Sequence, residues 1–229
     1  MNIILKGVVG STAYGLDHAG SDMDYLGIFV PPTEEIVGLS PPRESIVTKG
    51  PDTSLHEAKK FVTLALNGNP TLSDLLWLDT YEVMTEAGEE LINLRRSFLS
   101  ASRVRDAYLG YAVSQSERLK DRGDGSFSAD TRKRTEKHAR HLVRLVEQGF
   151  QLYVTGELVV NLRSSASSIS PDTVRAMSQK ISENPLWAQE YMRQAEERFD
   201  KARTCLPDQP DREAVNRWLV ELRRQSWNT

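Results

Sequence analysis

The chain has 229 residues, of which 39% are hydrophobic and 27% are charged, and its formal net charge at pH 7 is −3. This composition is typical of a globular protein, and no apolar run reaches the roughly 18 residues that a membrane-spanning helix needs. The single cysteine, Cys205, excludes an internal disulfide and favours a reducing compartment, so we expect a cytoplasmic protein.

Short strands are predicted in the first part of the chain. Runs that are rich in β-branched and aromatic residues, and bounded by glycine or proline, predict strands at residues 2–9, 22–30 and 44–50. From about His56 the apolar residues recur at helical spacing, and the predicted helix ends at a Gly-Asn pair. Pro70 then lies in the first turn of another helix, where its missing N–H group needs no partner.

The rest of the chain is predicted to be helical. The apolar spacing predicts helices at about residues 86–98, 101–121, 129–155, 171–183, 185–204 and 211–225. Polar stretches rich in glycine, serine and proline separate them and predict loops. We therefore expect an α+β protein, in which a small sheet with helices occupies residues 1–80 and an α-helical domain occupies residues 85–229.

Charge is unevenly distributed along the chain. Acidic side chains outnumber basic ones through residues 1–94, whereas residues 95–145 carry 13 basic and 6 acidic side chains, a net charge of +7. A negative region followed by a basic one suits a metal site that faces a polyanion. Ordinary solvated helix faces explain the same distribution, so charge alone leaves both interpretations open.

Two aspartates, Asp22 and Asp24, lie one residue apart at the start of an apolar strand. Side chains alternate along a strand, so both carboxylates should point to the same face. Two carboxylates on one face repel each other, and a hard divalent cation such as Mg²⁺ relieves this repulsion while it also binds substrate phosphate. The alternative is a solvent-exposed strand end at which the two acids bind nothing.

The pair Gly10–Ser11 follows the first predicted strand. A Gly-Ser turn at a strand end lets the backbone approach a phosphate group closely, with N–H groups and the serine hydroxyl as donors. The segment lacks the Gly-Lys-Ser/Thr of a P-loop and the G-x-G-x-x-G spacing of a dinucleotide site. The sequence therefore predicts a phosphate-binding turn shortly before a metal-binding pair.

This combination resembles the DNA polymerase β-type nucleotidyltransferase superfamily, whose motif is an apolar residue, Gly-Ser, a spacer of roughly ten residues and an acidic pair. Four ordered blocks are similar to one branch of it, the predicted nucleotidyltransferases associated with RNA-repair operons: residues 10–30, 52–77, 105–119 and 137–158. The resemblance covers about residues 3–160 and leaves 161–229 unmatched. It implies a small mixed sheet that carries the catalytic motifs and a helical domain that completes the nucleotide and acceptor cleft.

The resemblance also implies a third carboxylate on a neighbouring strand. The matching block begins at Asp52, which would share a metal ion with Asp22 and Asp24. Its role would be general base, or metal-assisted activation of the incoming hydroxyl. Glu57 is the alternative, although it falls in the first helical turn, where the helix dipole favours an acid anyway. The expected cofactor is Mg²⁺, with Mn²⁺ as an alternative.

A basic row is predicted on the helix at 129–155. Lys137, His141 and Arg144 recur at helical spacing beside an apolar stripe, and the matching family block has the same residue types. Such a row at the edge of a cleft could bind a nucleoside triphosphate together with Gly10 and Ser11. The alternative is a surface stripe that contains an ordinary histidine.

The residues and the resemblance together predict a metal-dependent nucleotidyltransferase. It would transfer a nucleoside monophosphate from an NTP to a hydroxyl acceptor, preferably an RNA, tRNA-like 3′ end, and release pyrophosphate. The alternatives are nucleotidylation of a protein or small molecule, and a non-catalytic nucleotide-binding or toxin–antitoxin module. The expected partners are an NTP and RNA, with no membrane.

Overall fold

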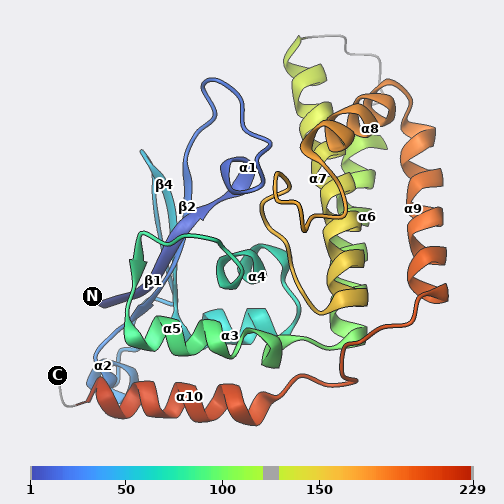
Figure 1. Ribbon diagram of the computed structural model, residues 1–229. Helices are drawn as coiled ribbons and strands as arrows, with labels where there is room; N and C mark the ends of the chain where they lie inside the picture. Colours follow the sequence, from blue (N-terminus) through green and yellow to red (C-terminus); the bar gives the residue numbers. More distant parts are fainter. Residues whose placement is uncertain (1, 121–128, 228–229) are drawn as a thin grey trace. The chain divides into compact units, whose positions relative to one another are not determined.

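The computed structural model describes residues 2–120 and 129–227, which form two compact units. The first unit comprises the residues up to Ser100 together with those from Gln209 onwards, and the second comprises Ala101–Asp208 (Figure 1). This division differs from the predicted boundary between 80 and 85. The reason is that helix α5 (Glu86–Asn93) packs on strand β1 (Asn2–Val9), and the last helix, α10 (Arg212–Gln225), returns to pack on α3 (Ala58–Leu66) and on α5.

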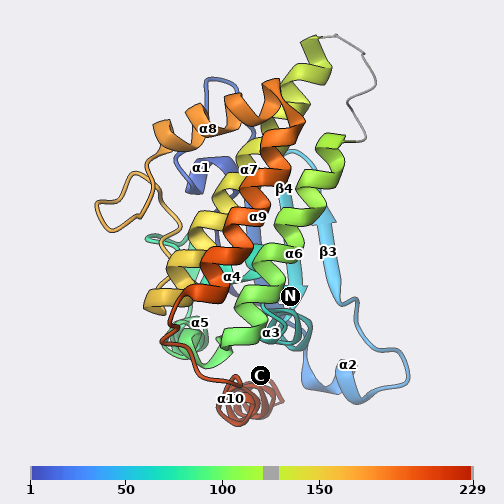
Figure 2. The same ribbon diagram turned by 90° about the vertical axis from the view of Figure 1, so that its right-hand side faces the viewer.

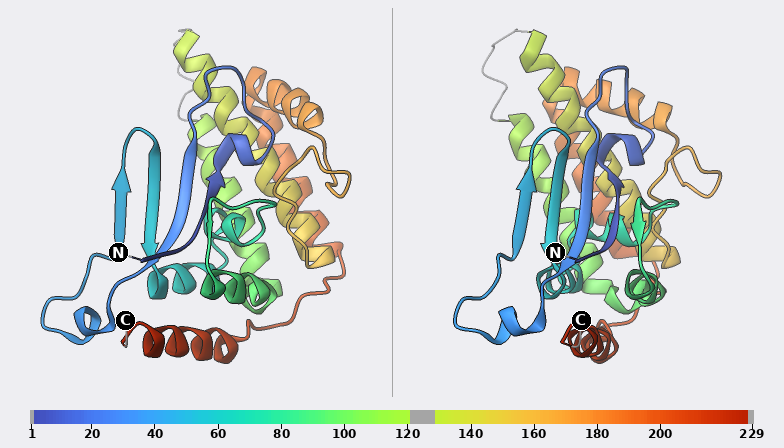
Figure 3. Two further views of the ribbon diagram at one scale, coloured as in Figure 1. Left: turned by 60° about the vertical axis from the view of Figure 1, so that its left-hand side comes forward. Right: turned by 90° about the vertical axis from the view of Figure 1, so that its left-hand side faces the viewer.

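The described residues of the first unit form a five-stranded mixed sheet in the order β3-β4-β2-β1-β5 (Figure 3). The strands are β1 (Asn2–Val9), β2 (Asp24–Val30), β3 (Ser45–Thr48), β4 (Asp52–Glu57) and β5 (Val83–Met84). Strands β2 and β4 are parallel, and the other pairs are antiparallel. The mixed sheet of an α+β protein is therefore confirmed, although β2 begins at Asp24 and leaves Asp22 in the preceding loop.

Helices of the first unit pack on this sheet and on each other. They are α1 (Gly10–Ala13), α2 (Thr33–Val37), α3 (Ala58–Leu66), α4 (Pro70–Leu76), α5 (Glu86–Asn93), the 3₁₀ helix η1 (Arg95–Phe98) and α10 (Arg212–Gln225). Helix α3 packs on β2 and β4, α4 on β1 and β2, and α5 on β1. The predicted start near His56 is two residues early, because β4 continues to Glu57, whose side chain caps α3.

The second unit consists, in its described residues, of the helices α6 (Ala101–Lys120), α7 (Ala129–Thr155), α8 (Pro171–Glu183) and α9 (Pro185–Lys201) (Figure 2). Helix α6 packs on α7 and α9, and α7 packs on α8. A Cβ atom at Gly149 of α7 would lie 2.6 Å from the side chain of Tyr108 on α6, so glycine allows these two helices to approach closely. All four helices were predicted, with ends that differ by at most a few residues.

Each unit has its own apolar core. Fully buried side chains of the first unit include Leu5, Ile28, Phe61 and Leu75, and those of the second include Tyr108, Leu142, Leu152 and Phe199. Among the residues that the structure describes, no helix combines the length and the apolar character needed to cross a membrane.

Candidate active site

The register of the sheet brings Asp24 and Asp52 side by side. Asp24, the first residue of β2, pairs with Val9, the last residue of β1, and with Asp52, the first residue of β4. Neighbouring strands lie about 4.8 Å apart, and paired residues project to the same face of the sheet. The two aspartates, which lie 28 residues apart in the sequence, therefore lie next to each other at one edge of the sheet.

The Gly10–Ser11 turn contacts this acidic edge. Gly10 begins α1 directly after Val9 and has a φ angle of +73°, a conformation that favours glycine. A Cβ atom at this position would lie 2.6 Å from Oδ2 of Asp24. Only glycine lets the backbone of the turn approach the Asp24 carboxylate so closely. The predicted phosphate-binding turn and the predicted metal ligand thus adjoin each other.

Asp22 lies outside the sheet, unlike Asp24 and Asp52. It is exposed in the loop that precedes β2, while Asp24 is half-buried and Asp52 is exposed. Within residues 2–120 and 129–227, no three acid, histidine or cysteine side chains gather closely enough to hold a metal ion. A pair of carboxylates, Asp24 and Asp52, is nevertheless a donor set that suits Mg²⁺, which commonly takes one or two carboxylates plus substrate phosphate oxygens.

Glu57 lies at the opposite end of β4 and has a structural role. Its Oε2 accepts hydrogen bonds from the amides of Lys59 and Lys60, over 2.9 and 3.4 Å, and so caps α3. Its Oε1 forms an ion pair with Arg223 of α10, and the residue is only 7% exposed. It lies five positions after Asp52 along the strand, a distance of roughly 16 Å. Of the two candidates for the third carboxylate, only Asp52 lies beside Asp24.

The basic row of α7 runs from the surface into the core of the second unit. Lys137 is exposed, whereas Arg144 is 4% exposed and donates to Oε1 of Gln148 over 2.7 Å. Gln148 donates in turn to the carbonyl oxygens of Val159 and Val160. Part of the row that was expected at the edge of a cleft is therefore engaged in holding the segment after α7, and its binding to nucleotide stays a prediction.

His141 in the same row does not carry a positive charge at neutral pH. Burial lowers its pKa to about 3, and the nearby cations Arg144 and Lys137 contribute to the same shift. A neutral imidazole can donate or accept a hydrogen bond but cannot neutralise a phosphate. The charge that was expected from the row at this position is therefore absent.

Two features near the sheet were missed in the sequence. Tyr14 donates a hydrogen bond to the buried Asp74 of α4, and the only sequence signal is an acid inside the apolar run of that helix.

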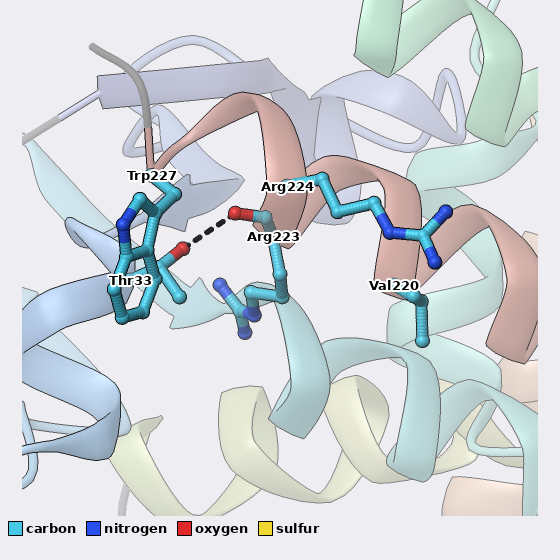
Figure 4. A pocket seen from close by; sticks show the side chains of 5 residues that line it. All are labelled: Thr33, Val220, Arg223, Arg224 and Trp227. Atoms are coloured by element: carbon cyan, nitrogen blue, oxygen red, sulfur yellow. Dashed lines mark hydrogen bonds between the residues drawn. The ribbon is translucent and has the colours of Figure 1, made fainter.

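The second feature is an open pocket of about 610 Å³ between α2 and α10. Figure 4 shows its lining, with the Thr33 hydroxyl donating to the carbonyl oxygen of Arg223 over 2.7 Å. The pocket is lined by Thr33, Val220, Arg223, Arg224 and Trp227. None of the candidate metal-binding acids is among these residues.

Comparison with known proteins agrees with this geometry. The model of the RNA repair pathway DNA polymerase beta family matches residues 1–221. The match extends over both units, well past the residues on which the resemblance was based. No sequence among the curated proteins matches the chain. With Gly10 against Asp24, and Asp24 beside Asp52, the chain belongs to the RNA repair pathway DNA polymerase beta family.

Proposed function

We propose that the protein transfers a nucleoside monophosphate from an NTP to a hydroxyl acceptor and releases pyrophosphate. The observation that supports this most directly is the sheet register, which aligns the end of β1 with the first residues of β2 and β4. This alignment joins a backbone turn suited to phosphate with two carboxylates suited to a divalent cation. Family membership supports the same class of reaction.

The chemistry assigned to each residue follows from its position. The acceptor oxygen attacks the α-phosphorus, the bond from that phosphorus to the bridging oxygen of the β-phosphate breaks, and pyrophosphate leaves. Asp52 takes the hydroxyl proton as general base, because it is exposed at the edge of the sheet beside Asp24. The amides of Gly10 and Ser11 and the Ser11 hydroxyl bind the β- and γ-phosphates.

Asp24 and Asp52 would hold Mg²⁺, and Asp22, two residues before Asp24, would reach the same ions from its loop. Magnesium bound there would offset the negative charge of the triphosphate during transfer. Mn²⁺ has the same preference for oxygen ligands and is the alternative. Lys137, His141 and Arg144 of the second unit are proposed as further nucleotide-binding residues, with Lys137 as the exposed cation and His141 as a neutral hydrogen-bonding group.

An RNA 3′ end, tRNA-like, is the proposed acceptor. Two observations support it: the net charge of +7 over residues 95–145, and the assignment of the family to RNA repair. Binding that depends on phosphate contacts weakens steeply as salt increases, because counterions are released from the nucleic acid. An RNA acceptor therefore predicts a strong dependence on salt, whereas a small-molecule acceptor predicts little.

The test is nucleotide transfer with purified protein, each labelled NTP in turn, Mg²⁺ or Mn²⁺, and total RNA. Asp24→Asn and Asp52→Asn should each slow transfer about 10²- to 10³-fold, because each loses several kcal/mol of electrostatic stabilisation. Glu34→Gln removes one exposed acid from α2 and is the matched control, which should transfer at the wild-type rate. Equal rates in wild type and both aspartate variants would refute the metal assignment. Label in protein or a small molecule instead of RNA would refute the acceptor.

A further inference from the structure

A buried hydrogen bond links the Gly10–Ser11 turn to helix α4. The hydroxyl of Tyr14 donates to Oδ2 of Asp74 over 2.5 Å, and the two residues are 4% and 0% exposed. Tyr14 directly follows α1, whereas Asp74 lies in α4, 60 residues further along the chain. The bond therefore joins two segments that only the folded first unit brings together.

Helix α4 is a firm support for this bond. The side-chain oxygen of Asn69 caps it by accepting from the amide of Leu72 over 3.2 Å. Every residue from Leu72 to Leu76 is buried, and the helix packs on β1 and β2. Close-packed side chains resist displacement, so Asp74 keeps a fixed position relative to the sheet.

Tyr14 is also bonded to the residues of the turn. Its amide donates to the carbonyl oxygen of Gly10 over 3.1 Å, and the amide of Leu16 donates to that of Ser11 over 2.9 Å. Gly10 in turn lies against the Asp24 carboxylate. A continuous series of contacts therefore leads from Asp74 through Tyr14 and Gly10 to Asp24.

Burying the Asp74 carboxylate costs free energy, and a position that only has to be filled does not require a carboxylate. Burial removes its hydration, and an apolar pair of similar size would fill the same space without that loss. A short hydrogen bond, however, fixes both the distance and the direction of Tyr14, which apolar contact does not. We propose that Asp74 is a positioning residue that acts through Tyr14. It holds the Gly10–Ser11 turn at the distance from Asp24 that a metal-bound triphosphate requires, a role that rests on the proposed function.

The experiment compares two variants of this bond with a matched control in the same unit. Tyr14→Phe removes the hydroxyl alone, and Asp74→Asn retains an oxygen that can accept from Tyr14. Thr33→Val also removes one buried hydroxyl hydrogen bond, the one to Arg223, on α2 rather than at the turn. Four quantities are measured for each protein: thermal stability, amide hydrogen exchange over residues 10–16, and the KM and kcat with the labelled NTP.

Tyr14→Phe should raise the KM for NTP about tenfold, because displacement of a positioned group weakens binding of the reacting phosphates. Exchange of the amides over residues 10–16 should accelerate in the same variant. Asp74→Asn should retain most of the wild-type behaviour, and Thr33→Val should leave both readouts unchanged despite its own loss of stability. These results together would support a positioning role.

The proposal is overturned if Tyr14→Phe and Thr33→Val have the same KM, because the bond would then serve stability alone. It is also overturned if exchange over residues 10–16 is unchanged in Tyr14→Phe. Failure of the proposed function has a different appearance. A wild-type protein that transfers no nucleotide refutes that function, and the positioning role with it, whatever the exchange rates of the variants are.

Discussion

Strand β4 carries an acid at each end, and the two acids have opposite surroundings. Asp52 is exposed beside Asp24, at the edge where the Gly10–Ser11 turn lies. Glu57 is buried, caps α3 and is paired with Arg223. An acid whose oxygens are satisfied by the protein contributes to stability. An acid held at a rigid edge next to another carboxylate is instead available to a ligand. The surroundings, and not the residue type, distinguish these two roles.

The largest effect is expected from substitution of Glu57, the buried acid of β4. Glu57→Ala should lower the free energy of unfolding by about 3–5 kcal/mol, because it removes a helix cap and leaves the Arg223 guanidinium without its carboxylate. Asp52→Ala is the matched substitution on the same strand and should change stability by only about 0.5 kcal/mol. Denaturant titrations measure both values. Equal losses in the two variants would contradict the assignment of separate roles.

The second effect extends the comparison to a half-buried base, His141. Its pKa is about 3 in the folded protein and about 6.5 in an unfolded chain, so below pH 6.5 the unfolded chain binds the proton that the folded protein excludes. The contribution of neutral His141 to the free energy of unfolding is therefore fully present above pH 6.5, and it is lost as the pH falls toward 3. This residue alone should make the protein about 2 kcal/mol less stable at pH 5 than at pH 7.5.

Unfolding titrations across this pH range check the prediction, with His141→Gln as the comparison. The variant should have a flatter dependence of stability on pH, although His56 adds a contribution of the same sign because burial lowers its pKa too. Identical pH profiles for the variant and the wild type would show that His141 titrates normally in the folded protein.

The smallest effect on stability is expected from Mg²⁺ binding beside Asp24 and Asp52, at the exposed end of β4. Mg²⁺ at ten times its dissociation constant should add about 1.4 kcal/mol to the free energy of unfolding, because it binds only the folded arrangement of acids. Asp24→Asn should abolish this gain, while Glu34→Gln on α2 should retain it. Thermal unfolding with and without Mg²⁺ measures the difference. A gain that survives in Asp24→Asn would place the ion elsewhere.

Local elements of this fold could be predicted well because they depend on neighbouring residues. The helical spacing of apolar side chains identified α6 to α9, and Pro70 marked the start of α4. The Gly10–Ser11 pair and Asp24 could also be singled out as candidates, because the motif that joins them is short. In each case the physical cause lies within about ten residues of the chain.

Contacts between distant segments could not be predicted in the same way. Glu57 and Arg223 are 166 residues apart, and Tyr14 and Asp74 are 60 apart, so no local spacing links either pair. The resemblance proposed Asp52, but only the parallel register of β2 and β4 shows that it lies beside Asp24. The basic row illustrates the converse, because helical spacing placed its residues on one helix, α7, yet did not reveal that Arg144 is buried.

The path of the chain between the two units has a practical consequence. The amide of Asp211 donates to the carbonyl oxygen of Ser97 over 2.8 Å, and the amide of Ala101 donates to that of Pro207 over the same distance. The chain thus leaves the sheet-bearing unit and re-enters it at adjacent points, which makes residues 101–208 an insertion in a discontinuous fold. Truncating the chain after residue 100 would remove α10, and Glu57 would lose its ion pair with Arg223. Excising the inserted helices and joining the two cut ends with a short linker should keep that pair intact.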